Sequence, residues 1–267
     1  MEFKDQLHRV ISLETVPKRI ISLVPSQTEL LCDLGLEHAL VGITKFCIHP
    51  KELRKKVTVV GGTKQIHLDK IKALNPDIIL CNKEENTKEI VEACEGICQV
   101  HVSDIYNLED SLNLIAQYGT LFNCKLKAEK IVETIKAEFN EFQDFVKDEP
   151  VVSVAYFIWK SPWMAAANHT FINYLLNINK FENVFGHLER YPEIEPNKLD
   201  AGGAPEFVLL SSEPFPFKDI HKNEAQEIFP KSKAILVDGE MFSWYGSRLM
   251  AAFKYFKTLR LNLHTQL

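Results

Sequence analysis

The longest regular segment of the sequence runs from Lys125 to Lys147, and it constrains the fold more than any other feature. Its apolar residues recur at helical spacing while charged residues fill the remaining face. These apolar positions are Ala128, Ile131, Val132, Ile135, Phe139, Phe142 and Val146. At 1.5 Å per residue such a helix is about 35 Å long, which suits a span across two lobes better than a place inside one. The sequence therefore predicts two lobes joined by one long helix.

Short apolar runs alternate with helical patterns on both sides of that helix. Before it, strands are predicted at 19–24, 40–43, 57–60, 77–81 and 97–102, with helices near 26–34, 68–74 and 88–95. After Pro150, strands are predicted at 151–158, 206–210 and 234–237, with helices at 170–178 and 247–261. This alternation is typical of mostly parallel sheets covered on both faces. The predicted fold is α/β, with β/α lobes at 1–122 and 149–267 and the connecting helix at 123–148.

The first predicted helix carries a capping signal. Ser26, Gln27, Thr28 and Glu29 stand in the order Ser-x-x-Glu, in which both side chains can satisfy free N–H groups at a helix start. We therefore expect a capping box there.

Composition excludes several classes of partner. Of the 267 residues 46% are hydrophobic and 25% are charged, a balance that fills ordinary cores. The net charge of -5 gives no reason to expect nucleic acid or an anionic membrane as partner. No apolar run approaches the ~18 residues that a membrane helix needs. We expect a monomer that does not span a membrane.

The N-terminus and the cysteines bear on the compartment. The segment 1–8 lacks the basic and apolar regions of a secretory signal, which leaves open either a cytoplasmic protein or a leader absent from the sequence. All six cysteines lie in the first half, and Cys32 and Cys81 stand in apolar runs typical of small buried side chains. We expect free thiols, which fit a reducing compartment slightly better.

Several short motifs occur in a fixed order along the chain. They are RIISLVPSQTE at 19–29, GG at 61–62, LDKI at 68–71, NPDII at 75–79, FENVF at 181–185 and SRLMAA at 247–252. In this order they resemble the class III substrate-binding proteins of ABC transporters, which include the vitamin B12-binding and ferric-siderophore receptors. The resemblance covers almost the whole chain from Arg19 on. It implies a non-enzymatic periplasmic protein whose two lobes hold a small-molecule metal chelate between them, with no cofactor of its own and an ABC permease as partner.

The loops that follow strands are the expected ligand contacts. From the N-terminal lobe we predict Pro25, Ser26, Phe46, Cys47, Thr63, Lys64 and Asn82. From the C-terminal lobe we predict Trp159, Trp163, Tyr191, Met241, Phe242, Trp244 and Tyr245. Aromatic rings supply contact area to flat or apolar ligands at little conformational cost. The predicted ligand is a corrinoid or a ferric siderophore or haem-like iron chelate.

Comparison with the vitamin B12 receptor shows departures. Two tryptophans of its N-terminal lobe align with Thr63 and Asn82, and a third aligns with Tyr191, so the aromatic grip on a corrinoid is thinner here. The resemblance also implies one acidic residue on each lobe that contacts permease arginines. Asp69 matches the first position, whereas the second falls on Lys198, with Glu195 nearby.

Other chemistries have weaker support in the sequence. Cys94, Cys98 and His101 could supply three zinc ligands, but the spacing is not that of a standard zinc finger and no fourth ligand stands nearby. A receptor for a bare metal ion would need several scattered histidines to converge. A cytoplasmic enzyme or corrinoid-handling protein on the same fold is the remaining alternative, although no nucleophile elbow or phosphate-binding loop is present.

Overall fold

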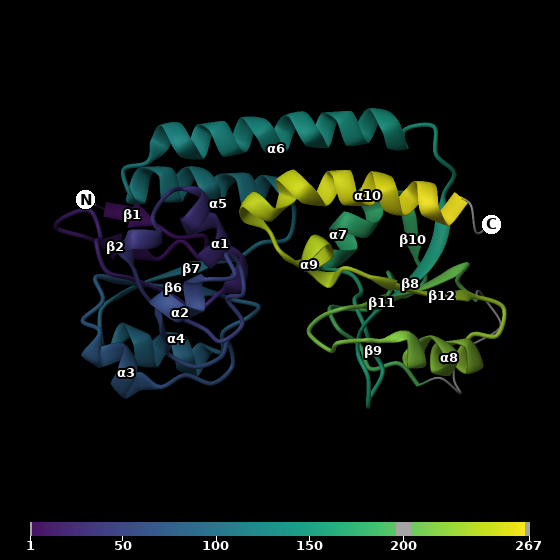
Figure 1. The fold of residues 1–267 in the computed structure, drawn as a ribbon, viewed down its shortest axis with the longest axis horizontal. Coiled ribbons are helices and arrows are strands. Elements are labelled where there is room, and N and C mark those ends of the chain that lie inside the picture. The colour runs from purple at the N-terminus through teal and green to yellow at the C-terminus, as the bar shows by residue number, and fades with distance from the viewer. Residues whose placement is uncertain (1, 196–203, 265–267) are drawn as a thin grey trace. The chain divides into compact units, whose positions relative to one another are not determined.

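Two mostly parallel β-sheets, one in each of two units, form the framework of the computed structural model, which describes residues 2–195 and 204–264 (Figure 1). Unit 1 comprises Met1–Lys136 and Trp244–Met250, and unit 2 comprises Ala137–Ser243 and Ala251–Leu267. The predicted α/β class is confirmed. The second unit does not keep the whole C-terminal part of the chain, because seven residues near its end belong to unit 1.

The unit 1 sheet is parallel and has the strand order β5-β4-β3-β6-β7. Its strands are β3 (Ile20–Ser22), β4 (Leu40–Ile43), β5 (Thr58–Val59), β6 (Ile78–Asn82) and β7 (Gln99–Ser103). The helices are α1 (Pro25–Asp33), α2 (Leu53–Lys56), α3 (Leu68–Ala73), α4 (Lys88–Glu95) and α5 (Leu108–Leu121), with a 3₁₀ turn η1 at Glu37–Ala39. A separate antiparallel pair consists of β1 (Glu2–Lys4) and β2 (Val10–Ser12). Every residue of β3 and β6 is buried, as expected for central strands covered on both faces.

The unit 2 sheet has the order β10-β8-β11-β12, and the short β9 pairs antiparallel with β8. Its strands are β8 (Val152–Trp159), β9 (Met164–Ala165), β10 (Phe181–Asn183), β11 (Phe207–Ser211) and β12 (Lys233–Val237). The helices are α7 (Phe171–Ile178), α8 (Asp219–Ile228), α9 (Gly239–Ser243) and α10 (Leu249–His264), and the 3₁₀ turn η3 (Gly246–Arg248) precedes α10. The predicted strands are present, whereas α2, α5, α8, α9, β1, β2, β9 and β10 were not predicted. Most of these elements are short, but α5 was missed although Leu108, Leu112 and Ile115 recur at helical spacing.

The predicted capping box at the start of α1 is wrong. The helix begins two residues earlier than the motif requires, with Val24 rather than Ser26 as N-cap and Pro25 in the first turn, and no side chain caps it. Proline suits this position because its fixed φ is helical and it has no N–H to satisfy. Glu29 is instead paired with Arg248.

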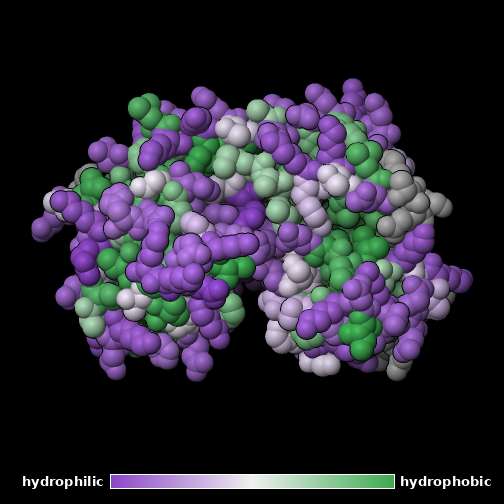
Figure 2. Space-filling view, in the orientation of Figure 1, coloured by the Kyte–Doolittle hydropathy of each residue, from purple (hydrophilic) through white to green (hydrophobic). Residues whose placement is uncertain are grey.

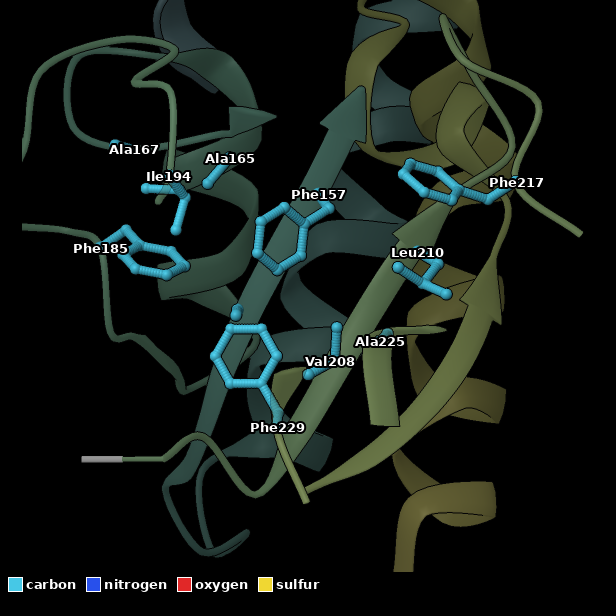
Figure 3. Packing of buried hydrophobic residues seen from close by; sticks show 11 residues of the cluster. Phe157, Ala165, Ala167, Phe185, Ile194, Val208, Leu210, Phe217, Ala225 and Phe229 are labelled. Carbon is cyan, nitrogen blue, oxygen red and sulfur yellow. The ribbon is translucent and has the colours of Figure 1, made fainter. Parts of the chain in front are cut away.

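Aromatic and aliphatic side chains fill one face of the unit 2 sheet (Figure 3). Phe157 of β8 lies among Phe185 and Phe229, with ring centroids 5.9 Å from each. Val208 and Leu210 of β11 extend this cluster along the next strand. On the outer surface, polar residues cover much of the visible face, with apolar residues among them (Figure 2).

The helix α6 (Lys125–Val146) matches the predicted helix to within one residue, and it contributes to both units. In unit 1 it packs closely on α5, where a Cβ atom on Gly119 would lie 2.6 Å from that of Ala128. In unit 2 it packs on α10, where the ring of Phe142 stacks on Phe253 at 6.0 Å and contacts Phe256 at 5.9 Å. The small residue and the aromatic residues thus fix the two ends of one uninterrupted helix to different partners.

Replacement of Phe142 by alanine tests the packing of α6 in unit 2. Phe142 is 2% exposed, so the Phe142→Ala variant should lose about 3–5 kcal/mol of unfolding free energy. The matched control is Leu126→Ala on the same helix, where the side chain is 84% exposed and the change should stay within about 0.5 kcal/mol. Urea denaturation followed by circular dichroism measures both. Equal losses in the two variants would contradict the packing described.

Candidate functional site

The topology of each sheet marks one place where ligands bind in open α/β folds. That place lies beyond the carboxyl ends of two adjacent strands whose connections run in opposite directions. In unit 1 it lies between β3 and β6, since β3 leads to β4 and β6 leads to β7 on the other side. In unit 2 it lies between β8 and β11 for the same reason. The residues that follow these four strands are therefore the first to consider.

In unit 1 this crevice is filled by a buried hydrogen-bond network centred on Gln27. The Gln27 amide donates to the Ser103 hydroxyl at 2.7 Å and to the Tyr245 hydroxyl at 2.9 Å. Its Oε1 accepts a 2.6 Å bond from the hydroxyl of Tyr118. Asn82 at the end of β6 donates to the same Ser103 oxygen at 2.9 Å. The network joins α1, β6, β7, α5 and the segment Trp244–Met250.

Both tyrosines of this network are uncharged, and Tyr118 donates to Gln27 whereas the Tyr245 hydroxyl accepts from it. Burial raises the pKa of Tyr118 well above its usual value. Burial also raises the pKa of Tyr245, and the charge of Glu85 acts in the same direction. The protonated hydroxyls can therefore hydrogen-bond to the uncharged Gln27 and Ser103 side chains, and the network contains no buried charge on a tyrosine.

The segment that carries Trp244 and Tyr245 differs from its predicted place. The sequence put both residues in the C-terminal lobe, but the structure places them in unit 1. Three contacts explain this position: Tyr245 enters the network, Arg248 makes a two-pronged ion pair with Glu29 at 2.7 and 3.0 Å, and Gly246 N–H donates to the Ser111 hydroxyl. The indole of Trp244 lies 5.1 Å from the Arg248 guanidinium and 5.5 Å from the ring of His49, and it is 5% exposed.

The other predicted ligand residues of the N-terminal lobe fall into two groups. Pro25, Ser26, Cys47 and Asn82 are buried, and the oxygen of Asn82 accepts from the N–H groups of residues 84 and 85, which shapes the loop after β6. Phe46 and Lys64 are exposed and Thr63 is half-buried, so these three offer surface at the carboxyl edge of the sheet. Their contact with a ligand stays a prediction.

At the carboxyl edge of unit 2 the structure brings together Trp159, Trp163, Phe215 and Phe217, here called the aromatic shelf. Trp159 ends β8 and meets the edge of Phe215, which follows β11, with ring centroids 5.7 Å apart. Trp163 stacks on Phe217 at 5.6 Å, and Phe217 meets Phe215 at 4.8 Å. Trp159 is 39% exposed although it is one of the largest apolar side chains. Beside the shelf, Lys160 is paired with Glu224.

Phe215 and Phe217 were missed from the sequence. They lie in the motif Glu213-Pro214-Phe215-Pro216-Phe217, directly after a predicted strand. Applying to β11 the same rule that selected Trp159 after β8 would have found them.

The remaining predicted residues of unit 2 differ in exposure. Tyr191 is half-buried, with the Arg190 guanidinium 6.0 Å from its ring, and Met241 is half-buried in α9. Phe242 has no exposed surface, because its ring packs on Tyr156 at 5.1 Å and on Phe256 at 4.7 Å. Phe242 is therefore part of the core that supports α9 rather than a surface offered to a ligand.

The geometry does not assemble the zinc site considered for Cys94, Cys98 and His101. The His101 ring is hydrogen-bonded to Gln117, and burial raises the pKa of the Cys98 thiol to about 12, which opposes the thiolate that zinc requires. In the described parts of the chain no three or more His, Cys, Asp or Glu side chains form a group that could hold a metal ion. The six cysteines are free thiols, as predicted.

Two surface hollows occur at the opposite edge of the unit 1 sheet. The larger, of about 560 Å³, is lined by Cys32, Gly35, Glu37, His38, Leu40, Lys56 and Val57. The smaller, of about 380 Å³, is lined by Lys72, Asn75, Pro76, Gly96 and Ile97. Their lining residues precede β4 to β7, at the amino ends of the strands, so the sheet topology does not favour them as ligand sites.

Of the predicted permease contacts, Asp69 lies exposed in the first turn of α3, and Glu195 is exposed at the end of the described segment. Lys198 lies outside the described residues.

Two parallel-sheet units, with an aromatic shelf that exposes Trp159 at the carboxyl edge of one of them, are typical of ligand-binding proteins of the two-lobed type. A family model described as periplasmic binding protein matches residues 20–229, and the chain belongs to this family. The predicted relationship is confirmed. The family comprises binding proteins rather than enzymes. The prediction of a non-enzymatic protein is therefore also confirmed.

Two curated relatives illustrate the range of the family. The chain is 29% identical over 192 residues to "Uncharacterized ABC transporter substrate-binding lipoprotein YvrC" of Bacillus subtilis, an alignment covering 67% of this chain and 59% of the relative. It is 23% identical over 205 residues to the vitamin B12-binding protein of Pectobacterium carotovorum, covering 72% of this chain and 74% of the relative. The chain therefore spans about three fifths of the length of the first relative.

Solved structures share the fold. The periplasmic heme-binding protein RhuT of Roseiflexus sp. RS-1 superposes with a TM-score of 0.79 at 16% identity, over 92% of this chain and 98% of that one. The siderophore-binding protein BauB gives 0.79 at 14% identity, over 97% and 98%. In the described residues, no helix combines the length and the apolar character that crossing a membrane requires.

Replacement of Gln27 tests the buried network of unit 1. The Gln27→Leu variant leaves the Tyr118 hydroxyl without its acceptor, and it should lower the unfolding free energy by about 2–3 kcal/mol. Gln65→Leu is the control, because that side chain is exposed. Chemical denaturation provides the comparison, and an unchanged stability of Gln27→Leu would show that the network is not stabilising.

Proposed function

We propose that the protein is the substrate-binding component of an ABC-type uptake system, and that its ligand is a corrinoid or a ferric siderophore or haem-like iron chelate. Family membership supports the transport role. The observation that supports this ligand class is the aromatic shelf of unit 2. It places Trp159 and Phe215 at the topological switch point of the sheet, the place between β8 and β11 where the strand connections reverse direction. Aromatic faces suit ligands with a flat or apolar surface.

The relatives agree with this ligand class. Their names include binding of vitamin B12, heme and a ferric siderophore complex. In all three ligands a metal is enclosed in an organic chelate, so the protein itself has no need to supply a cluster of metal-binding side chains. We accordingly propose that the metal arrives with the ligand and that the protein uses no cofactor of its own.

The proposed location and partner follow from the transport role. A substrate-binding component works on the outer side of the cytoplasmic membrane, in the periplasm or held there as a lipoprotein, and it delivers ligand to a permease. Asp69 in unit 1 and Glu195 in unit 2 are the proposed permease contacts, since both are exposed acidic side chains.

Titration with candidate chelates tests the ligand class. Visible absorption can follow the addition of cobalamin, cobinamide, haem and ferric siderophores, and native mass spectrometry can give the stoichiometry. We expect saturable one-to-one binding of one class, and Trp159→Ala should weaken it about 30-fold, since central aromatic contacts each contribute about 2 kcal/mol. Val151→Ala is the matched control: Val151 is 60% exposed and adjoins the other end of β8.

The outcomes of this titration separate the possibilities. Loss of binding in Trp159→Ala but not in Val151→Ala supports the aromatic shelf as the ligand site. Equal binding by both variants would show that the ligand site is not the aromatic shelf. Absence of saturable binding by any chelate up to high micromolar concentration would contradict the proposed ligand class.

A further inference from the structure

The carboxyl edge of the unit 1 sheet carries a second group of exposed side chains, distinct in chemistry from the aromatic shelf. We propose that Lys45, Phe46 and Lys64, here called the cationic corner, bind an anionic group of the ligand, so that the preferred substrate is a negatively charged chelate. This inference rests on the proposed function and narrows its ligand class.

The three residues occupy neighbouring loops. Lys45 and Phe46 follow β4, and Lys64 lies in the turn that follows β5. The two loops are joined because the Lys45 N–H donates to the Gly61 carbonyl at 2.7 Å. A Cβ atom on Gly62 would lie 3.1 Å from the Phe46 ring and 3.5 Å from Lys45 Cε. Both side chains therefore lie over the glycine backbone, where a larger residue would displace them.

Phe46 is held outward by its buried neighbours. Thr44 and Cys47 have no exposed surface, and the Cys47 sulfur lies 3.2 Å from the Thr44 hydroxyl and 3.1 Å from that of Thr28. Arg54 donates to the Lys45 carbonyl at 3.0 Å and secures the same turn from outside. With both flanks fixed, Phe46 stays 47% exposed. An exposed aromatic residue on a fixed turn offers a preorganised contact that costs little ordering on binding.

The two lysines of the corner keep their charge available. In the described part of the chain neither has a carboxylate within ion-pair distance: Lys45 lies 4.9 Å from the Phe46 ring centroid, and Lys64 donates to the Glu84 carbonyl oxygen at 2.8 Å. Lys83 on the same edge differs, since Asp104 neutralises it at 2.6 Å. Two cations beside an exposed apolar ring match a ligand with an apolar body and a peripheral carboxylate or phenolate.

The test compares ferric chelates that differ in charge. Dissociation constants are measured for an anionic ferric catecholate, for haem with its two carboxylates, for an uncharged ferric trihydroxamate and for cobalamin, each at low and high sodium chloride. Lys45→Gln and Lys64→Gln should each weaken anionic chelates about threefold to fivefold and leave uncharged ones unchanged. The effect should shrink at high salt, because salt screens exposed charges. Lys45→Arg should retain the affinity.

Lys72→Gln is the matched control, since it removes an exposed lysine from the opposite edge of the same unit and should change nothing. If the protein binds uncharged chelates as tightly as anionic ones and the lysine variants match the parent, the cationic corner is overturned while the proposed function stands. If no chelate of either kind binds, the proposed function fails first and the inference with it.

Discussion

The hydrogen-bond network around Gln27 is the interaction on which unit 1 depends. A buried amide must find partners for its oxygen and its nitrogen, and here those partners come from α5, β7 and the segment Trp244–Met250. Tyr245 lies 218 positions from Gln27 in the chain. The network therefore joins the segment that precedes α10 to the first helix, α1. The ion pair between Glu29 and Arg248 fixes the same segment one helical turn further on.

The network also decides which surface of unit 1 can meet a ligand. In an open parallel sheet the crevice between β3 and β6 is the usual binding place, but here Tyr245 and its partners occupy it. The accessible edge therefore shifts to the neighbouring loops after β4 and β5, where Phe46 and Lys64 are exposed. Unit 2 shares the central reversal of strand connections, but Trp159 and Phe215 line the rim of its crevice. The two sheets thus present different side chains to a ligand: an aromatic ring with lysines in unit 1 and aromatic rings in unit 2.

Local sequence patterns predicted those features that depend on local physics. The apolar spacing of α6 determines a helix wherever the chain folds, and its bounds were predicted to within one residue. The apolar runs of β3 and β6 likewise predicted buried parallel strands. Among the site residues, Trp159 was selected because it follows a strand, and the structure places it at the switch point with an exposed ring.

Features that depend on distant partners could not be predicted in the same way. Nothing near Tyr245 indicates that its hydroxyl meets Gln27, so the aromatic run after β12 was interpreted as a loop of the second lobe. The capping box failed because α1 begins at Pro25, which takes Ser26 and Glu29 out of the N-cap and N3 positions, and Glu29 pairs with the distant Arg248 instead. Phe242 is an aromatic residue of the kind that often contacts ligands, but its ring is buried in the core. Its contacts with Tyr156 and Phe256, which the sequence does not reveal, establish this.

Rigid presentation links the two surfaces that the proposals use. Phe46 is held outward by buried Thr44 and Cys47, and Trp159 is held by Phe215, which itself rests on Phe217 of the unit 2 core. Each exposed ring is therefore the outermost member of a packed series, so little side-chain freedom remains to be lost on binding. The buried residues beneath these rings thus influence affinity without touching the ligand, because a loosening of Cys47 or Phe217 would leave Phe46 or Trp159 with more side-chain freedom to lose on binding.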